Sequence, residues 1–292
     1  MKTAPSAKCT QARDRGFTFL ELLVVLAVVG LLFLLLLPAV AGTRPNSQAV
    51  QCLANLRQMS VAWQMYTADN AGLLAMNGDE GFQPASLAAA QAGTDSQWCP
   101  GRMDAGAPTG QPTNSAWLKT GQIYPYLNNL GVYRCPADTS GYLNGAVYPV
   151  FGQGSSRVRS LSMNGWINPV LNDVGMDTTD YIVYRKDSDL NRPGPANLWV
   201  FIDESPYSIN EGLFLELTSG TTGPPKATAW TDIPATYHNG AGGISFADGH
   251  AQLRKWTDSV VLNFRSSAAS INGEPSNSGD LSWLMNLTTA HE

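Results

Sequence analysis

The strongest constraint on this chain is a long apolar stretch near its start, RGFTFLELLVVLAVVGLLFLLLLPAV at residues 15–40. Residues 22–41 carry no charge, and Glu21 is the one charged residue between Phe17 and that run. At ~1.5 Å per residue, a helix of this length can cross the ~30 Å hydrocarbon core of a bilayer. We therefore expect a membrane-spanning helix, with the rest of the chain attached to its C-terminal end.

Glu21 is unusual in such a helix. A carboxylate inside an apolar helix costs on the order of 2.5–3.5 kcal/mol on insertion scales, which favours a functional role. The alternative is that Glu21, at the start of the helix, reaches the headgroup region with its side chain. The residues that precede Glu21 favour the functional interpretation.

Gly16 is followed directly by Phe17, a hydrophobic run and Glu21. The segment before Gly16 is basic and contains Lys2, Lys8, Arg13 and Arg15. This arrangement resembles the processing site of type IV prepilins and type II secretion pseudopilins. The resemblance implies that prepilin peptidase cleaves after Gly16 and methylates Phe17. It also implies that Glu21 is the fifth mature residue and that Pro38 is the helix-kinking proline at mature position 22.

Cleavage after Gly16 would leave a positive amine on Phe17. Glu21 of a neighbouring subunit could pair with that amine in a bilayer or filament core, which favours assembly in one axial register. Pro38 removes a helical hydrogen bond and can bend the helix. The implied partners are prepilin peptidase, other pilin or pseudopilin subunits in a homo- or hetero-filament, and the cytoplasmic membrane.

The charge distribution predicts the orientation in the membrane. The chain has 23 acidic and 18 basic residues, a net charge of −5. Residues 1–16 carry a net +3, so the processed chain would carry −8. The positive leader is expected to stay in the cytoplasm, and the chain to cross the inner membrane once. The acidic remainder is then exported, and it could reach a filament or the cell surface after assembly. An acidic exported domain gives no support to nucleic-acid binding.

We expect an α+β fold in which a long N-terminal membrane-spanning helix, the pilin spine, packs on an antiparallel β-sheet domain with long loops. The predicted segments are a leader at 1–16, a transmembrane and assembly helix at 17–41, an amphipathic continuation of the spine at 42–70, an exported globular domain at 71–265, and a flexible tail with a short terminal helix at 266–292. Apolar residues of the amphipathic helix recur at three- and four-residue spacing, beginning with Val50 and Leu53. Gly72 is its stop signal.

Two strand regions can be predicted closely. The continuous apolar run at 198–202 favours a strand buried on both faces, and it ends on Asp203 and Glu204. In GGISFADGHAQLRKW, Asp248-Gly249 is the preferred sequence of a two-residue hairpin turn. That turn would pair Phe246 with Ala251.

His238 is followed, after nine intervening residues, by Asp248-Gly249. This spacing matches the H-x9-DG signature of a group of prepilin-like proteins abundant in planctomycetes and verrucomicrobia. Further segments that resemble the group are CLANLRQ at 52–58, MYTADNAG at 65–72, YRCPAD at 133–138, SMN at 162–164 and VFIDE at 200–204. The resemblance implies a pilin-like architecture, but no biochemical activity.

Cys9 would leave with the leader, and three cysteines remain. In an oxidising compartment one disulfide and one free thiol are the natural count. Cys99 and Cys135 both stand in Cys-Pro dipeptides and form a plausible local pair. Cys52 with Cys135 is the rival pair, because both stand in motifs of the second resemblance. A zinc site is weakly indicated, since the chain has no CxxC spacing.

Carboxylates at strand ends beside a histidine could bind a divalent cation. The candidate ligands are Asp203, Glu204, His238 and Asp248, with Asp138 as a further candidate. Oxygen-rich ligands favour calcium over zinc, whereas histidines with carboxylates would suit zinc or manganese. The alternative is structural, with Asp248 serving its turn, His238 bonding a loop backbone and Asp203 capping a strand end.

The sequence favours a structural role, as a pilin-like subunit of a type II secretion pseudopilus or a type IV pilus-like filament. It contains no GxSxG, HExxH or GxxxxGK motif, and no GxGxxG after a predicted strand, so we predict no enzymatic activity. The alternative is a membrane-anchored adhesin or a ligand-binding ectodomain for a glycan or metal. Candidate stacking surfaces for a glycan are Trp98, Trp117, Trp166 and Trp230.

Overall fold

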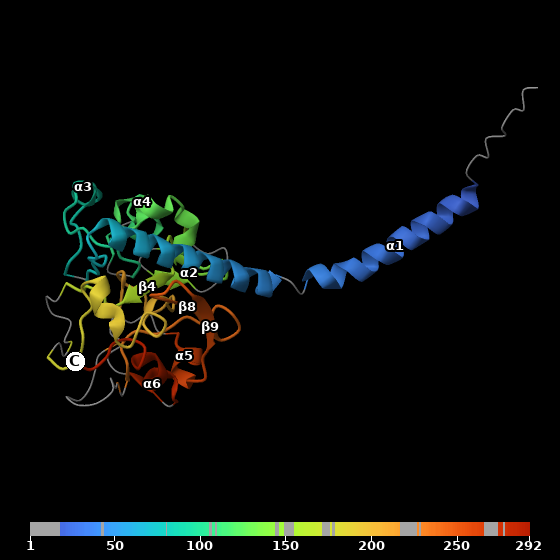
Figure 1. The fold of residues 1–292 in the computed structure, drawn as a ribbon. Helices are drawn as coiled ribbons and strands as arrows, with labels where there is room; N and C mark the ends of the chain where they lie inside the picture. The colour runs from blue at the N-terminus through green and yellow to red at the C-terminus, as the bar shows by residue number, and fades with distance from the viewer. Residues whose placement is uncertain are drawn as a thin grey trace, which may run out of the picture. The chain divides into compact units, whose positions relative to one another are not determined.

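The structure is a computed structural model of the chain. It describes residues 18–41, 44–79, 81–104, 107–108, 110–143, 146–148, 155–170, 176, 179–216, 227, 229–265, 274–276 and 278–292, and in these ranges the side chains of residues 33–46, 142–148, 155 and 274 are not described. Two compact units are present, Met1–Arg44 and Pro45–Glu292, and each is described by itself. Figure 1 shows the elements of both.

The first unit contains one helix, α1 (Phe19–Ala41), among its described residues. Its large apolar side chains are exposed from Phe19, at 78%, onward through Leu32, at 53%. Within the part of the chain that the structure describes, no helix is long and apolar enough to cross a membrane.

The second unit begins within the first turn of α2 (Arg44–Asp69), which packs on a mixed α+β body. The buried face of α2 is formed by Cys52, Leu56, Met59 and Trp63, at the spacing of one helical face. Val50, which the sequence assigned to this face, is instead 67% exposed. The helix ends at Asp69, and Gly72 follows with a φ of +79°, a conformation that suits glycine at a helix end.

The body contains a five-stranded sheet in the order β6-β4-β5-β8-β9. Its strands are β4 (Leu161–Asn164), β5 (Trp199–Asp203), β6 (Leu213–Phe214), β8 (Ala241–Phe246) and β9 (Ala251–Lys255). All neighbours are antiparallel except β4 and β6. Every residue of β5 is buried, which confirms the strand predicted at 198–202.

Two hydrophobic cores cover the two faces of this sheet. The first joins α2 and the long loops to Phe201 and Ala251, and the second joins Ile202, Ile244 and Phe246 to the C-terminal elements α5 (Ser259–Asn263) and α6 (Asp280–Met285). Figure 1 shows α2 on one side of β8 and β9 and the two C-terminal helices on the other. Phe201 of β5 enters the first core and Ile202 the second, whereas Val200 joins Phe201 in the first core, where the pairing of β5 with β8 is irregular.

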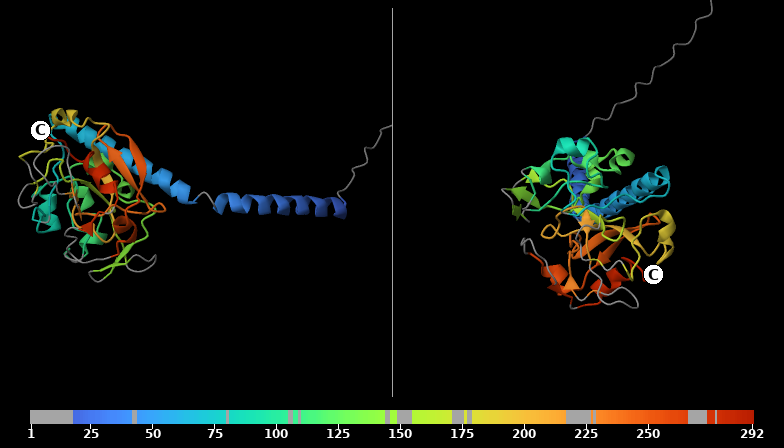
Figure 2. Two further views of the ribbon diagram at one scale, coloured as in Figure 1. Left: turned by 90° about the horizontal axis from the view of Figure 1, so that it is seen from below. Right: turned by 90° about the vertical axis from the view of Figure 1, so that its left-hand side faces the viewer.

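The remaining elements are short. They are α3 (Leu87–Gln91), α4 (Tyr124–Leu127), the 3-10 helices η1 (Gln111–Thr113), η2 (Leu118–Thr120), η3 (Leu130–Tyr133) and η4 (Asp187–Asn191), and the strands β1 (Gly141–Leu143), β2 (Ala146–Tyr148), β3 (Ser155–Ser156), β7 (Ala229–Trp230) and β10 (Glu274–Pro275). In the right-hand view of Figure 2, α2 lies between the teal and green segment with α3 and α4 and the yellow to red part of the unit.

The β8–β9 hairpin differs from its prediction by one residue. Ser245 pairs with Ala251 and Ile244 with Gln252, so the predicted pairing of Phe246 with Ala251 is wrong. Gly249 has a φ of +93°, whereas Asp248 is not among the residues with positive φ. A two-residue type I′ turn needs positive φ at both positions, and the observed pattern is that of a three-residue loop with glycine last.

The C-terminal segment contains the expected short helix as α6, but where the structure describes it the segment packs against the body instead of forming a free tail. Leu281, Leu284 and Met285 of α6 are buried in the second core, and β10 pairs with β7. Arg254 of β9 donates a hydrogen bond to Asp280, which ties the start of α6 to the sheet. Three apolar side chains on one face of six residues supply enough burial to dock this helix.

Candidate functional site

The start of α1 is the first candidate site, and the structure describes it from Thr18 onward. Gly16 and Phe17, the predicted cleavage and methylation positions, lie outside the described residues. Thr18 N and Oγ1 donate hydrogen bonds to Glu21 Oε2 at 2.8 and 2.9 Å, and Glu21 N donates back to Thr18 Oγ1 at 3.3 Å. This is a reciprocal capping box, T-x-x-E, that sequence reasoning overlooked. Pro38 lies within α1, and its side chain is outside the described part.

The second candidate site is a cluster of Cys52, Cys135, Asp203 and His238, which we call the Cys–His–Asp cluster. One sulfur, oxygen or nitrogen atom from each residue lies within 4.8 Å of the other three. Cys52 Sγ donates to Asp203 Oδ2 at 3.1 Å, and Cys135 Sγ lies 3.3 Å from His238 Nε2. The two cysteines and Asp203 are buried and His238 is partly buried.

Local sequence explains how two of these side chains are placed. Cys135 begins a Cys-Pro-Ala-Asp turn that is closed by a hydrogen bond from Asp138 N to Cys135 O, and proline suits the second position of such a turn. His238 begins a tight turn in which Asn239 and Gly240 both have positive φ. The backbone groups of His238 and Ala241 bond each other across that turn, which leads directly into β8.

Asp203 ends β5 on the face that α2 covers. Its Oδ2 also accepts a hydrogen bond from Gly243 N of β8 at 3.0 Å. A Cβ at position 243 would lie 2.9 Å from Asp203 Oδ2, 3.1 Å from Cys52 Sγ and 2.5 Å from Leu56 Cδ1. Glycine at 243 is therefore what lets α2 approach the sheet closely enough to bring Cys52 to Asp203.

Burial favours the neutral forms of the four groups. It raises the pKa of Asp203 to about 7 and lowers the pKa of His238. The hydrogen bond that Cys52 shares with Cys135 raises the pKa of the Cys52 thiol, and burial adds to this effect. The same hydrogen bond lowers the pKa of Cys135, but burial together with the negative charges of Asp203 and Asp138 outweighs it, and the net shift is upward. Neutral imidazole is the form that ligates metals.

Two predicted metal ligands lie elsewhere. Glu204 follows Asp203 directly and faces the opposite side of the sheet, where it accepts hydrogen bonds from Ser162 and Ser208. Asp248 lies in the exposed β8–β9 loop, with its Oδ1 2.6 Å from His250 Nδ1. The structure thus brings together Asp203 and His238 of the predicted set, and adds two sulfur atoms in place of two carboxylates.

The same geometry distinguishes between the two predicted disulfide pairs. Cys52, Cys99 and Cys135 are free thiols in the part of the chain that the structure describes. Cys99 is buried outside the cluster, in the field of Arg159, and burial raises its pKa to about 11. Of the two pairs that the sequence suggested, Cys52 and Cys135 are the pair that the fold brings into one cluster.

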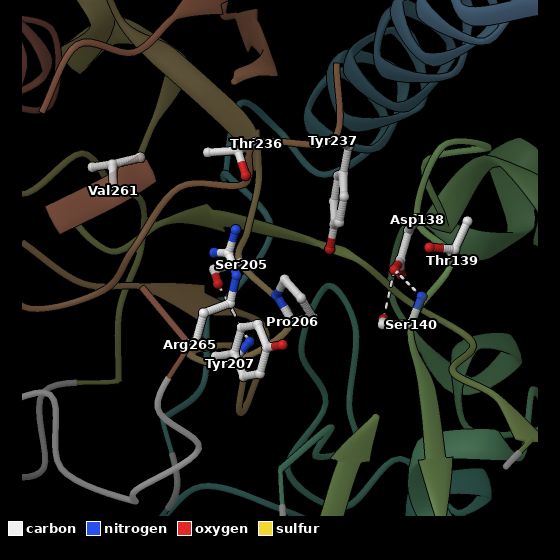
Figure 3. Close-up of a pocket in the computed structure, with 10 residues that line it drawn as sticks. All are labelled: Asp138, Thr139, Ser140, Ser205, Pro206, Tyr207, Thr236, Tyr237, Val261 and Arg265. Atoms are coloured by element: carbon white, nitrogen blue, oxygen red, sulfur yellow. Dashed lines mark hydrogen bonds between the residues drawn. The ribbon is translucent and has the colours of Figure 1, made fainter. Parts of the chain in front are cut away.

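A small pocket of 240 Å³ lies near the cluster (Figure 3). Its lining includes Asp138, which follows Cys135 by three residues, and Tyr237, which precedes His238. Tyr237 Oη donates to Glu204 O at 2.9 Å, and Arg157 bonds the hydroxyl of Ser140 at 2.9 Å. The described residues that line it include no cysteine or histidine, and none of the four cluster residues.

The four tryptophans suggested as glycan-stacking surfaces are buried. Trp98, Trp166 and Trp230 are 0% exposed, and Trp117 is 7% exposed. The indole N–H of Trp230 bonds Asp258 and that of Trp166 bonds the carbonyl of Glu216. These side chains fix loops to the body, so they cannot present a stacking surface to a sugar.

The sequence grouped Asp203 with His238 and Cys52 with Cys135, but it did not join the two pairs into one site. Cys52 stands in CLANLRQ, Cys135 in YRCPAD, Asp203 in VFIDE and His238 in the H-x9-DG segment. Each of four short motifs therefore supplies one residue of the cluster. The presence of a metal-ligating residue type in each of the four motifs was the sequence signal for this site. Cysteines considered only as disulfide partners, and carboxylates only as cation ligands, do not reveal it.

Comparison with known proteins finds similarity at the N-terminus. The family description "Prokaryotic N-terminal methylation motif" matches residues 11–37. The chain is 33% identical over 58 residues to the type II secretion system core protein G of Pectobacterium carotovorum subsp. carotovorum. That match covers 20% of this chain and 37% of the relative, so the chain spans little more than a third of the protein it resembles. No solved structure matches the chain.

Proposed function

We propose that this chain is a pilin-like subunit that prepilin peptidase cleaves after Gly16 and methylates on Phe17, and that assembles with other subunits into a pseudopilus or pilus-like filament. The role is structural. The observation that carries the proposal is the methylation motif over residues 11–37, followed by an apolar helix whose described large side chains are exposed. The similarity to a type II secretion core protein supports the same role.

Exposed apolar side chains along α1 need a covering. Phe19 and Leu20 are 78% and 72% exposed, and the exposure continues over successive turns up to Leu32. Contiguous apolar surface of this kind marks a membrane or protein contact. In the proposed subunit, lipid covers α1 before assembly, and the α1 helices of neighbouring subunits cover it afterwards.

Glu21 has two tasks in this account. Within one chain it completes the capping box with Thr18, which satisfies N–H groups at the start of α1. In the filament it pairs with the methylated amine of Phe17 in a neighbouring subunit, which sets the axial register. The exported acidic domain then faces outward from the helical core.

Three variants test the proposal and separate the two tasks of Glu21. Gly16→Ala should leave the leader attached. Glu21→Ala should be cleaved and assemble poorly. Glu21→Gln is the decisive variant, because glutamine also serves at this position of a capping box but carries no charge.

We expect Glu21→Gln to be cleaved normally, to keep α1 and to assemble as poorly as Glu21→Ala. The measurement is the yield of crosslinked oligomers and sheared filaments from cells that express the cognate assembly proteins. Normal assembly of Glu21→Gln would show that capping is the only task of Glu21. Normal assembly of both Glu21 variants, together with normal cleavage of Gly16→Ala, would remove the proposal.

A further inference from the structure

We propose that the Cys–His–Asp cluster is a metal site that binds one Zn²⁺ ion through Cys52, Cys135, His238 and Asp203. The four donor atoms already lie within 4.8 Å of one another, although the residues come from α2, the turn after η3, the end of β5 and the turn before β8. Four groups is the number that a tetrahedral structural zinc site requires.

The chemistry of the donors selects the ion. Two sulfur atoms, one imidazole nitrogen and one carboxylate oxygen form a set that suits zinc, whereas calcium takes six to eight oxygen ligands. The sequence favoured calcium because its candidate ligands were mainly carboxylate oxygens. Because Glu204 and Asp248 lie elsewhere, that set does not form, and the sulfur atoms of Cys52 and Cys135 occupy the space instead.

A second observation that points to a bound cation is the environment of the Asp203 carboxylate. Asp203 is 0% exposed, and its Oδ1 has no hydrogen-bond partner among the residues that the structure describes. A buried carboxylate oxygen without a partner is costly and calls for an explanation. An ion bound between Asp203 and the two sulfur atoms would supply a positive charge to that carboxylate.

Gly243 allows the ligand side chains to pack closely together. Its backbone N–H fixes Asp203 Oδ2 at 3.0 Å, and the absent side chain leaves room for the sulfur of Cys52. Three of the four ligands are buried and His238 is partly buried, so the site is closed on the side of the core and reached from the side of His238. Four protein ligands leave no open coordination position on the ion, which is typical of structural rather than catalytic zinc.

Binding is an exchange of protons for the metal. Zn²⁺ replaces the thiol protons of Cys52 and Cys135, together with the proton on Asp203 when it is present, and no electron is transferred. The two thiolates, the carboxylate and the ion then sum to a single negative charge. His238 binds through a ring nitrogen in its neutral form and releases no proton.

The ion would tie the helix of the second unit to its sheet. Cys52 and Asp203 are 151 residues apart, and Cys135 and His238 are 103 residues apart. A ligand that binds only the folded state stabilises that state. Zinc would therefore fix α2 against β5 and β8.

The test uses the full-length chain in detergent, purified without chelators and with its thiols protected from oxidation. Elemental analysis should find one zinc ion per chain. Cobalt added to the chelator-treated protein should give near-ultraviolet absorption from thiolate-to-cobalt charge transfer and the visible ligand-field bands of tetrahedral Co²⁺. Calcium added at the same concentration should neither raise the melting temperature nor displace cobalt.

Matched cysteine variants locate the site. Cys52→Ala and Cys135→Ala should each lower zinc affinity by at least about 100-fold, since even outer partners of a zinc site cost roughly 10–100-fold. Cys99→Ala removes a buried thiol outside the cluster and should leave zinc content and the cobalt spectrum unchanged. If the buried cysteine variants fail to fold, His238→Gln is the variant to use, because His238 is partly exposed and its loss should change the cobalt spectrum while the fold remains.

Other outcomes would overturn the proposal. One is a purified chain without zinc that shows neither a cobalt spectrum nor a rise in melting temperature with zinc. Another is a disulfide between Cys52 and Cys135 in protein taken directly from cells, detected by mass spectrometry of alkylated peptides. Loss of metal in Cys99→Ala but not in Cys52→Ala would likewise place the metal elsewhere.

Discussion

Cys52 Sγ donates a hydrogen bond to Asp203 Oδ2 at 3.1 Å, and this contact joins the buried face of α2 to the end of the central strand β5. The same carboxylate oxygen accepts the backbone N–H of Gly243 on β8. Helix, central strand and hairpin strand therefore meet at one oxygen atom. The position of α2 on the sheet depends on how closely the chain can pack around that atom.

Gly243→Ala tests this dependence. A Cβ at this position would lie 2.5 Å from Leu56 Cδ1 and 2.9 Å from Asp203 Oδ2, so the helix or the strand must shift. We expect a loss of roughly 1–3 kcal/mol in the free energy of unfolding, which is the usual cost of overpacking. The measurement is urea denaturation followed by tryptophan fluorescence.

Gly279→Ala is the control for that variant. A Cβ at Gly279 would meet no atom within 4 Å among the described residues, and its φ of −77° suits any residue. Gly279 is the exposed N-cap of α6, where glycine is preferred to alanine, so the effect should stay below about 1 kcal/mol. Equal effects of the two substitutions would contradict the close approach of α2 to β8.

Glu216 predicts a pH dependence of stability. Burial raises its pKa well above the ordinary value, and its Oε1 has no hydrogen-bond partner within the described structure. The folded chain binds a proton on Glu216 more tightly than the unfolded chain does. The contribution of Glu216 to the free energy of unfolding is therefore fully present below its unfolded pKa near 4.5, and it is lost as the pH rises toward the folded pKa. Glu216→Gln removes this titration.

Relative to the original chain, Glu216→Gln should therefore gain stability as the pH rises from about 4.5 toward neutrality. The gain should be on the order of 1 kcal/mol per pH unit over that window. Thermal unfolding at several pH values measures it. The exposed Glu292, replaced by Gln, is the control, and a pH-independent difference for Glu216→Gln would contradict its buried, unpaired state.

Asp280 should make the folding stability depend on pH in the opposite direction from Glu216. Burial alone would raise its pKa, but hydrogen bonds from the backbone N–H groups of Thr257 and Asp258 and from Arg254 outweigh burial and hold the pKa below the ordinary value. The stabilisation is thus present above the unfolded pKa of about 3.8 and is lost as the pH falls through the folded pKa.

Asp280→Asn should consequently destabilise the chain by roughly 1.5–3 kcal/mol at neutral pH, the usual worth of hydrogen bonds to a charged group. The deficit should shrink as the pH falls below about 3.8, because the original aspartate then also becomes neutral. Denaturation curves at neutral and acid pH measure it. A deficit that grows on acidification would show that the charge of Asp280 does not hold α6 to the sheet.

Strong local patterns predicted parts of the fold correctly. The apolar run at 198–202 became the fully buried β5, and the helix before Gly72 ends at Asp69. The hairpin shows the limit of such patterns. Asp-Gly fits both a two-residue turn and a three-residue loop, and only the backbone of Asp248 distinguishes them, so the register was missed by one residue.

The candidate site shows a second limit. Asp203 and Glu204 are adjacent in sequence, yet the alternation along the strand sends them to opposite faces. Cys52 and Asp203 are far apart in sequence, yet the docking of α2 brings them into contact. Sequence proximity therefore suggested the wrong carboxylate neighbour, and no local rule could supply the cysteine.

The central claim is that this chain is processed and methylated as a pilin-like subunit, and the mass of its mature N-terminus tests that claim most directly. Co-expression with prepilin peptidase, isolation from the membrane and mass spectrometry of the N-terminal peptide should show a chain that begins at N-methylated Phe17 and has lost residues 1–16. A chain that retains its leader, or is cut at another position, would contradict the account.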